Sequence, residues 1–93
     1  MKKFVRISVK GKVQGVFFRQ STKEKADELG IKGIVRNMPD SSVYIEAVSA
    51  DDNILNEFIL FCHEGPPLSR VSNVDAEYVT GLASDYAGFE VKE

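Results

Sequence analysis

Residues 11–20 read GKVQGVFFRQ, and they lie where a strand pattern gives way to a helix pattern. Over residues 4–10, apolar and polar side chains alternate with the period of two that is typical of a strand. From Phe18 to Leu29, apolar positions recur at helical spacing, and Gly30 can end the helix as its C′ residue. Residues 11–18 are therefore predicted to form the loop that enters this helix.

The first residue of this helix has two interpretations. Ser21 and Glu24 have the spacing of a capping box, which favours a later start. The helical register of Phe18 indicates an earlier start. A helix that begins at 19–21 is the favoured prediction.

Residues 33–49 have the pattern of a β-hairpin. Two strand-like segments, 33–37 and 43–49, flank the stretch NMPDSS at 37–42, which contains a Pro-Asp turn. This pattern predicts two antiparallel strands, the first of which ends at Asn37.

The second half of the chain predicts a further helix and two more strands. Asp51 or Asp52 can cap the helix, whose wide apolar stripe ends before Gly65. Strand-like alternation returns at 74–78, and a short strand is expected around 89–91. The order β-α-β-β-α-β, with an extra C-terminal edge strand, predicts an α+β fold with two helices on one face of an antiparallel sheet.

Composition limits the classes of function. The 93 residues predict a single domain over residues 1–93, with a monomer as the default. The N-terminal apolar residues alternate with polar ones, and no long apolar run follows, so no export signal and no membrane partner are expected. A single cysteine, Cys62, fits a reducing, cytoplasmic setting. The net charge of -2 argues against nucleic acid as the main partner.

The loop before the first helix has the components of an anion site. Helix N-termini present unpaired N–H groups and a partial positive charge. Gly11 and Gly15 permit positive φ angles, and the guanidinium of Arg19 can pair with two phosphate oxygens. Residues 16–18 are expected to exclude water and to fix the loop against the core. The alternative is an ordinary tight turn beside a solvated arginine, since no Walker A sequence is present.

GKVQGVFFR together with GIKGIVRNMPD resembles the paired signature of the acylphosphatase family. The similarity extends to EGPPLSRV at 64–71 and YAGFEV at 86–91, and so over nearly the whole chain. The resemblance implies a ferredoxin-like α/β sandwich. It also implies hydrolysis of a small-molecule acyl phosphate without a metal or other cofactor.

The resemblance also implies roles for individual residues. Arg19 would bind the phosphoryl oxygens, and Asn37 would position the attacking water through its amide. The backbone N–H groups of one loop would wrap the phosphate, and its residues are Gln14, Gly15, Val16, Phe17 and Phe18. Two features depart from the family pattern: Ile34 replaces a common Trp, and Ser41-Ser42 replaces a glycine after the turn. These changes concern local packing and the hairpin turn, and neither is at a residue with an expected role in the reaction.

The alternative function is a non-catalytic ferredoxin-like module that binds a metabolite, a partner protein or single-stranded RNA. RNA-binding members usually carry stacking aromatics in a Lys/Arg-Gly-Phe-type strand, which this chain lacks. Turnover in the presence of a chelator distinguishes the enzyme from the binding module.

Overall fold

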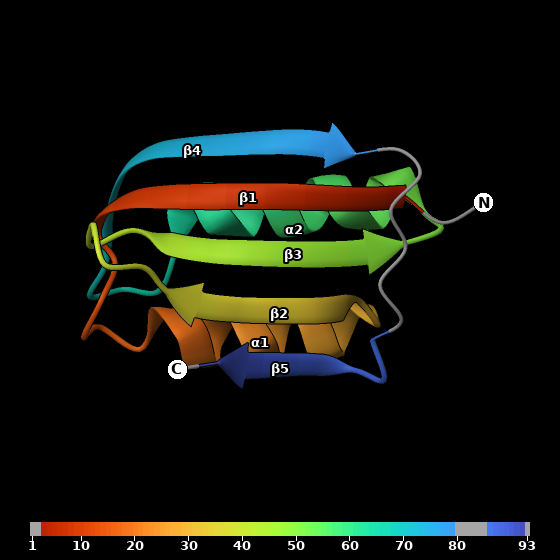
Figure 1. Ribbon diagram of the computed structural model, residues 1–93, viewed down its shortest axis with the longest axis horizontal. Helices are drawn as coiled ribbons and strands as arrows, with labels where there is room; N and C mark the ends of the chain where they lie inside the picture. Colours follow the sequence, from red (N-terminus) through yellow and green to blue (C-terminus); the bar gives the residue numbers. More distant parts are fainter. Residues whose placement is uncertain (1–2, 80–85, 93) are drawn as a thin grey trace.

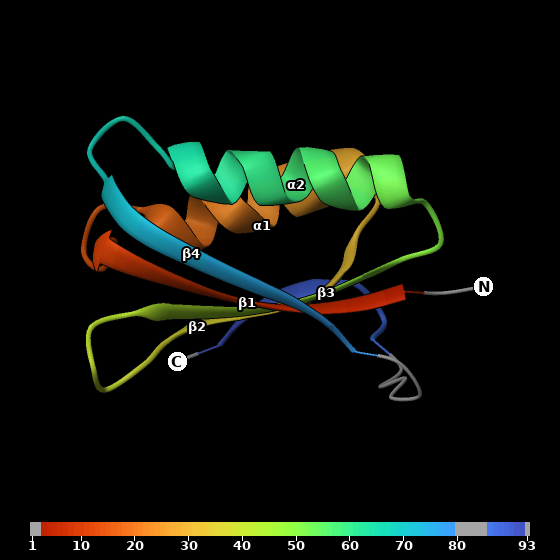
Figure 2. The same cartoon turned by 90° about the horizontal axis from the view of Figure 1, so that it is seen from above.

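Five strands form one sheet, and two helices pack against one of its faces (Figures 1 and 2). The computed structural model describes residues 3–79 and 86–92. The strand order across the sheet is β4-β1-β3-β2-β5. No helix within the described residues is both long and apolar enough to cross a membrane. The elements in chain order are β1 (Lys3–Lys12), α1 (Phe18–Leu29), β2 (Lys32–Asn37), β3 (Val43–Ser49), α2 (Asp52–Glu64), β4 (Arg70–Val79) and β5 (Phe89–Lys92).

This architecture confirms the predicted α+β fold, with one difference in strand direction. The pairs β1–β3, β1–β4 and β2–β3 are antiparallel, but β5 pairs in parallel with β2, so the sheet is mixed and not wholly antiparallel. The reason is visible in Figure 1, where β4 ends and β5 begins at the same end of the sheet. The last strand therefore runs in the direction opposite to β4. Strand β2 also runs opposite to β4, so β5 and β2 are parallel.

The core lies between the sheet and the helices. Val5, Ile7 and Val9 have no exposed surface, as the alternation predicts, because they lie on the face that the helices cover. On α2, Phe58 is equally buried, and its ring meets Phe89 of β5 edge to face at 5.9 Å. The last strand is thereby tied to the same core.

Helix α1 begins earlier than the favoured prediction of 19–21. Its first residue is Phe18, and Ser21 N donates to the Phe17 carbonyl at 3.0 Å instead of forming a capping box with Glu24. Phe18 is 1% exposed, so burial of its ring in the core outweighs the local capping pattern. Gly30 ends the helix at φ 71°, as predicted.

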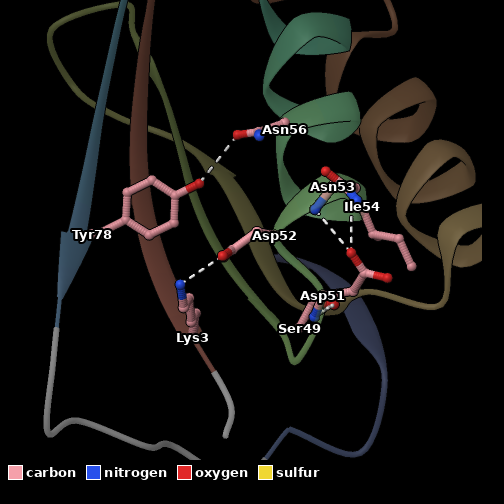
Figure 3. A network of polar contacts seen from close by, with 8 residues as sticks. All are labelled: Lys3, Ser49, Asp51, Asp52, Asn53, Ile54, Asn56 and Tyr78. Carbon is pink, nitrogen blue, oxygen red and sulfur yellow. Dashed lines mark hydrogen bonds and ion pairs between the residues drawn. The ribbon is translucent and has the colours of Figure 1, made fainter.

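Helix α2 begins with a side-chain cap from Asp51 (Figure 3). Asp51 Oδ1 accepts hydrogen bonds from Asn53 N at 2.8 Å and Ile54 N at 3.3 Å. Asp52, in the first turn, forms an ion pair with Lys3 Nζ at 2.6 Å. This pair raises the pKa of Lys3, first through the hydrogen bond and then through the charge of Asp52.

The strand before α1 is longer than predicted, so the loop is shorter. A register shift lies between Lys10 and Gly11, and β1 continues to Lys12. Gly11 has a φ of 128°, and a Cβ there would lie 2.1 Å from the Arg70 carbonyl oxygen. Glycine is required at this position because β4 approaches the backbone closely. The connection to α1 is therefore 13–17 and not 11–18.

Candidate active site

A hollow of about 270 Å³ lies at the N-terminal end of α1. The start of this helix and the carboxyl ends of β2 and β5 lie at the same end of the molecule (Figure 1). In the described part of the chain, no cluster of His, Cys, Asp or Glu side chains is arranged to hold a metal ion. The residues that line the hollow are Val13, Gly15, Phe17, Phe18, Arg19, Gln20, Asn37 and Val91.

The hollow brings together most of the residues that the sequence singles out. Arg19 lies on α1 and Asn37 on β2, and both line the hollow. Two of the predicted loop residues do not line it. The side chain of Val16 is 6% exposed and belongs to the core, and the side chain of Gln14 bonds to the β2–β3 turn. The residues brought together are Gly15, Phe17, Phe18, Arg19 and Asn37.

The loop backbone has the conformation of an anion cradle. Gly15 has a φ of 74° and Phe17 a φ of 64°, so left-handed residues lie on both sides of Val16. A Cβ on Gly15 would meet nothing within 4 Å, so glycine serves the backbone angle here and not the space. Within the described residues, no backbone N–H of residues 15–20 donates to a protein acceptor. These donors, at the positive end of α1, can serve an anion.

Phe17 departs from the expectation that residues 16–18 all seal the loop against the core. Val16 and Phe18 are buried, but Phe17 is 73% exposed. The reason is geometric, because the left-handed backbone at the N-cap position turns this ring away from the core that holds its neighbours. A bulky residue in this conformation is unusual, and such strain concentrates at functional sites.

Arg19 is fixed by the last strand. Its Nη1 donates to the Lys92 carbonyl oxygen at 2.8 Å. One of the five guanidinium donors is thus used to orient the plane of the group at the wall of the hollow. Val91, the residue before Lys92, lines the same space.

Asn37 is the last residue of β2 and pairs with Val43 of β3. Its neighbour Arg36 lies on the opposite face, with its guanidinium 5.6 Å from the centre of the Tyr44 ring, as strand alternation predicts. The Oδ1 atom of Asn37 is buried and has no hydrogen-bond partner among the described residues. Buried acceptors without partners are rare in folded proteins, and this one belongs to a residue that lines the hollow.

Sequence reasoning did not identify Val13, Gln20 and Val91 as lining residues. Gln20 follows Arg19 in the first turn of the helix, so the prediction of an anion at this helix end already contained the signal for it. Val91 lines the hollow only because β5 pairs with β2, where Val91 is the partner of Val35. No local pattern indicates that pairing.

The acylphosphatase family model matches residues 5–91. The chain belongs to the acylphosphatase family. It is 47% identical over 91 residues to the acylphosphatase of Rubrobacter xylanophilus, an alignment that covers 97% of this chain and 80% of that protein.

Solved acylphosphatase structures have the same fold. The acylphosphatase from Coxiella burnetii superposes with a TM-score of 0.90 at 36% identity, over 98% of this chain and 93% of that one. The acylphosphatase from Bacillus subtilis gives a TM-score of 0.89 at 31% identity, with both chains covered completely. The likeness therefore includes every element around the hollow.

The turn at Ser41-Ser42, where the sequence departs from the family pattern, is closed by its own hydrogen bonds. Ser41 has a φ of 76°, the left-handed region that glycine adopts without strain. Asp40 holds the turn, because its Oδ1 accepts from Ser42 N at 3.0 Å and from Ser42 Oγ at 2.5 Å. These hydrogen bonds keep the pKa of the Asp40 carboxyl below its usual value, the Ser42 side chain having the largest effect. Asn37 is thereby carried at the end of a regular strand pair.

Proposed function

We propose that the protein is an acylphosphatase, which hydrolyses a carboxylic–phosphoric mixed anhydride to a carboxylate and inorganic phosphate. One structural observation carries the assignment of the site: Arg19 and Asn37, far apart in sequence, line one hollow with the loop at the start of α1. The match of the family model over residues 5–91 supports the assignment of the reaction.

The proposed site binds the phosphoryl group with fixed positive charge and N–H donors. The backbone N–H groups of Gly15, Phe17 and Phe18 surround the oxygens, and the guanidinium of Arg19 pairs with two of them. Gln14 and Val16 contribute to the same loop through their backbone. Phosphoryl transfer spreads charge over the equatorial oxygens, so preorganised donors at these positions lower the barrier.

Asn37 positions the attacking water in this scheme. Its side-chain amide holds the water by a hydrogen bond, and the water oxygen then attacks phosphorus on the side opposite the acyl oxygen. The bond between phosphorus and the acyl oxygen breaks, and the carboxylate leaves with the electron pair. The carboxylate is a good leaving group that needs no general acid, and a phosphate oxygen takes the proton of the water. This scheme uses no metal and no cofactor.

We also propose that the chain works as a single-domain monomer in the cytoplasm. The single cysteine, Cys62, is buried, and burial raises its pKa to about 12, so the thiol is protected from oxidation. The net charge of -2 argues against nucleic acid as the main partner, and it means that an anionic substrate is held by a local site and not by the overall field. The sequence has no long apolar run that would favour a membrane partner.

Hydrolysis of benzoyl phosphate in the presence of a chelator tests this function. The wild type should turn over, whereas Arg19→Ala and Asn37→Ala should each lose about a hundredfold to a thousandfold in kcat/KM. Arg36→Ala and Asn56→Ala are matched controls, because they remove the same groups away from the hollow, and they should keep wild-type rates.

Circular dichroism verifies that each variant is folded. Full activity in Arg19→Ala or Asn37→Ala would overturn the assigned roles. A wild type that binds phosphate without any turnover would instead favour the non-catalytic module.

A further inference from the structure

The side chain of Gln14 connects the phosphate loop to the β2–β3 turn. Its Nε2 atom donates to the carbonyl oxygens of Met38 and Ser42, each at 2.9 Å. The side chain is partly buried and does not line the hollow. The proposed role of Gln14 in the loop involves only its backbone, so these two contacts need a separate explanation.

The two carbonyls that Gln14 contacts lie at the base of the turn. Met38 N donates to the Ser42 oxygen at 2.8 Å, and Ser41 N donates to the Met38 oxygen at 3.1 Å. The bonds from Gln14 therefore share the acceptors that close the turn. Ser42 is 4% exposed, so its oxygen has little access to solvent and depends on partners from the protein.

The base of this turn also places Asn37. Met38 directly follows Asn37, and Ser42 directly precedes Val43, the strand partner of Asn37. No hydrogen bond within the described residues holds the amide group of Asn37 itself. The position of Asn37 is therefore set by the backbone at the end of β2. Gln14 bonds to Met38, which follows Asn37, and to Ser42, which precedes the strand partner of Asn37.

We propose that Gln14 is a positioning residue that sets the placement of Asn37 relative to the phosphate loop. The inference rests on the proposed function. Water must attack in line with the bond that breaks, and a misplacement of about 1 Å can cost a hundredfold in rate. A carboxamide suits the task because one NH₂ group offers two donors, which match two carbonyl acceptors.

A double-mutant cycle separates positioning from simple support of the turn. Gln14→Ala should lower kcat for benzoyl phosphate by about 10- to 100-fold, because Asn37 is no longer aligned. Competitive inhibition by inorganic phosphate should change by less than about threefold, since the loop donors and Arg19 remain. In the Asn37→Ala background, Gln14→Ala should cost less than about threefold more, because the group that it positions is already absent.

A destabilised control excludes a general effect of lower stability. Asp51→Ala weakens the cap of α2 and should leave kcat unchanged. The inference is overturned if Gln14→Ala keeps wild-type kcat, or if it costs the same factor with and without Asn37. A wild type that does not hydrolyse benzoyl phosphate would overturn the proposed function as well, so the two failures are distinct.

Gln14→Glu adds a pH-dependent test of the hydrogen bonds that the side chain at position 14 donates. As a carboxylate, Glu places acceptor oxygens against two carbonyls, so kcat should be as low as in Gln14→Ala. As pH falls, the protonated acid regains one donor, and kcat relative to wild type should rise severalfold. A ratio of kcat values that stays constant with pH, while Gln14→Ala is slow, would contradict the role of the donated hydrogen bonds.

Discussion

The two helices lie side by side on the sheet, yet their N-termini are built in opposite ways. Helix α2 begins with the Asp51 cap and with Asp52 in its first turn, and Lys3 pairs with Asp52 (Figure 3). Helix α1 has no side-chain cap and no acidic residue in its first turn. Its second residue is a cation, Arg19, which is unfavourable beside the positive end of a helix.

The capped N-terminus of α2 serves stability, whereas the uncapped N-terminus of α1 is available for function. A side-chain cap contributes about 0.5–2 kcal/mol, and an acidic residue in the first turn adds about 0.3–1 kcal/mol. At α2 both contributions are present, and the N–H groups are partly satisfied within the protein. At α1 both are absent, and most of the residues with open N–H groups line the hollow together with Arg19. A phosphate bound at the N-terminus of α1 can accept hydrogen bonds from these open N–H groups and so take the place of a cap.

The largest effect is expected from Arg19→Lys, which keeps the charge at the open end but changes its geometry. Lysine offers a compact point charge without the planar fork, so it does not hold two phosphate oxygens and the Lys92 carbonyl in one fixed plane. We expect kcat/KM for benzoyl phosphate to fall about a hundredfold. A rate within threefold of wild type would show that charge alone is sufficient at this position.

Gln20→Glu makes the first turn of α1 resemble that of α2. A carboxylate at the wall of the hollow repels a dianion, so KM should rise about tenfold, and more at low ionic strength. Stability should change by less than about 0.5 kcal/mol, because the favourable dipole interaction is offset by repulsion from Glu24 one turn later.

Steady-state kinetics at two salt concentrations measure the effect of Gln20→Glu. Gln20→Ala is the neutral control and should change KM by less than about threefold. Equal KM values for Gln20→Glu and wild type at low salt would contradict an anion site at this helix end.

Asp51→Ala removes the cap that distinguishes α2. The free energy of unfolding should fall by about 1 kcal/mol, because two backbone N–H groups lose their acceptor. Turnover of benzoyl phosphate should remain at the wild-type rate. Urea denaturation and the standard assay measure the two quantities. A loss of turnover without a loss of stability would show that the two helix ends are not independent.

Phe17→Gly should have the smallest effect, an increase in the free energy of unfolding of up to about 1 kcal/mol. The left-handed backbone at φ 64° is strained for phenylalanine but not for glycine, and the 73% exposed ring loses little burial. Phe17→Ala is the matched control and should give no such gain, since alanine keeps the strain. Equal stabilities of the two variants in urea would contradict strain at this cap.

Local patterns were sufficient to predict most elements. The alternation of Val5, Ile7 and Val9 reports one buried face, and the hairpin at 37–42 has strong turn chemistry, so both predictions agree with the structure. The start of α1 was misplaced because Ser21 and Glu24 form a local pattern, whereas the burial of Phe18 depends on the whole core.

Long-range features had no local signal. A short strand at 89–92 has the same composition whether it pairs in parallel or antiparallel, so the direction of β5 was not predictable from its residues. The same holds for the bonds of Gln14, whose residue type indicates only a polar loop position. Its acceptors, Met38 and Ser42, are defined only once the turn folds beside the loop.

Titration with inorganic phosphate, followed by the backbone amide signals in ¹⁵N NMR spectra, compares the two helix ends in one experiment. We predict saturable shifts concentrated at residues 15–20, no comparable shifts at Asp52 and Asn53, and loss of the response in Arg19→Ala. Shifts at the start of α2, or an unaffected loop in a protein that hydrolyses benzoyl phosphate, would contradict phosphate binding at the open end of α1.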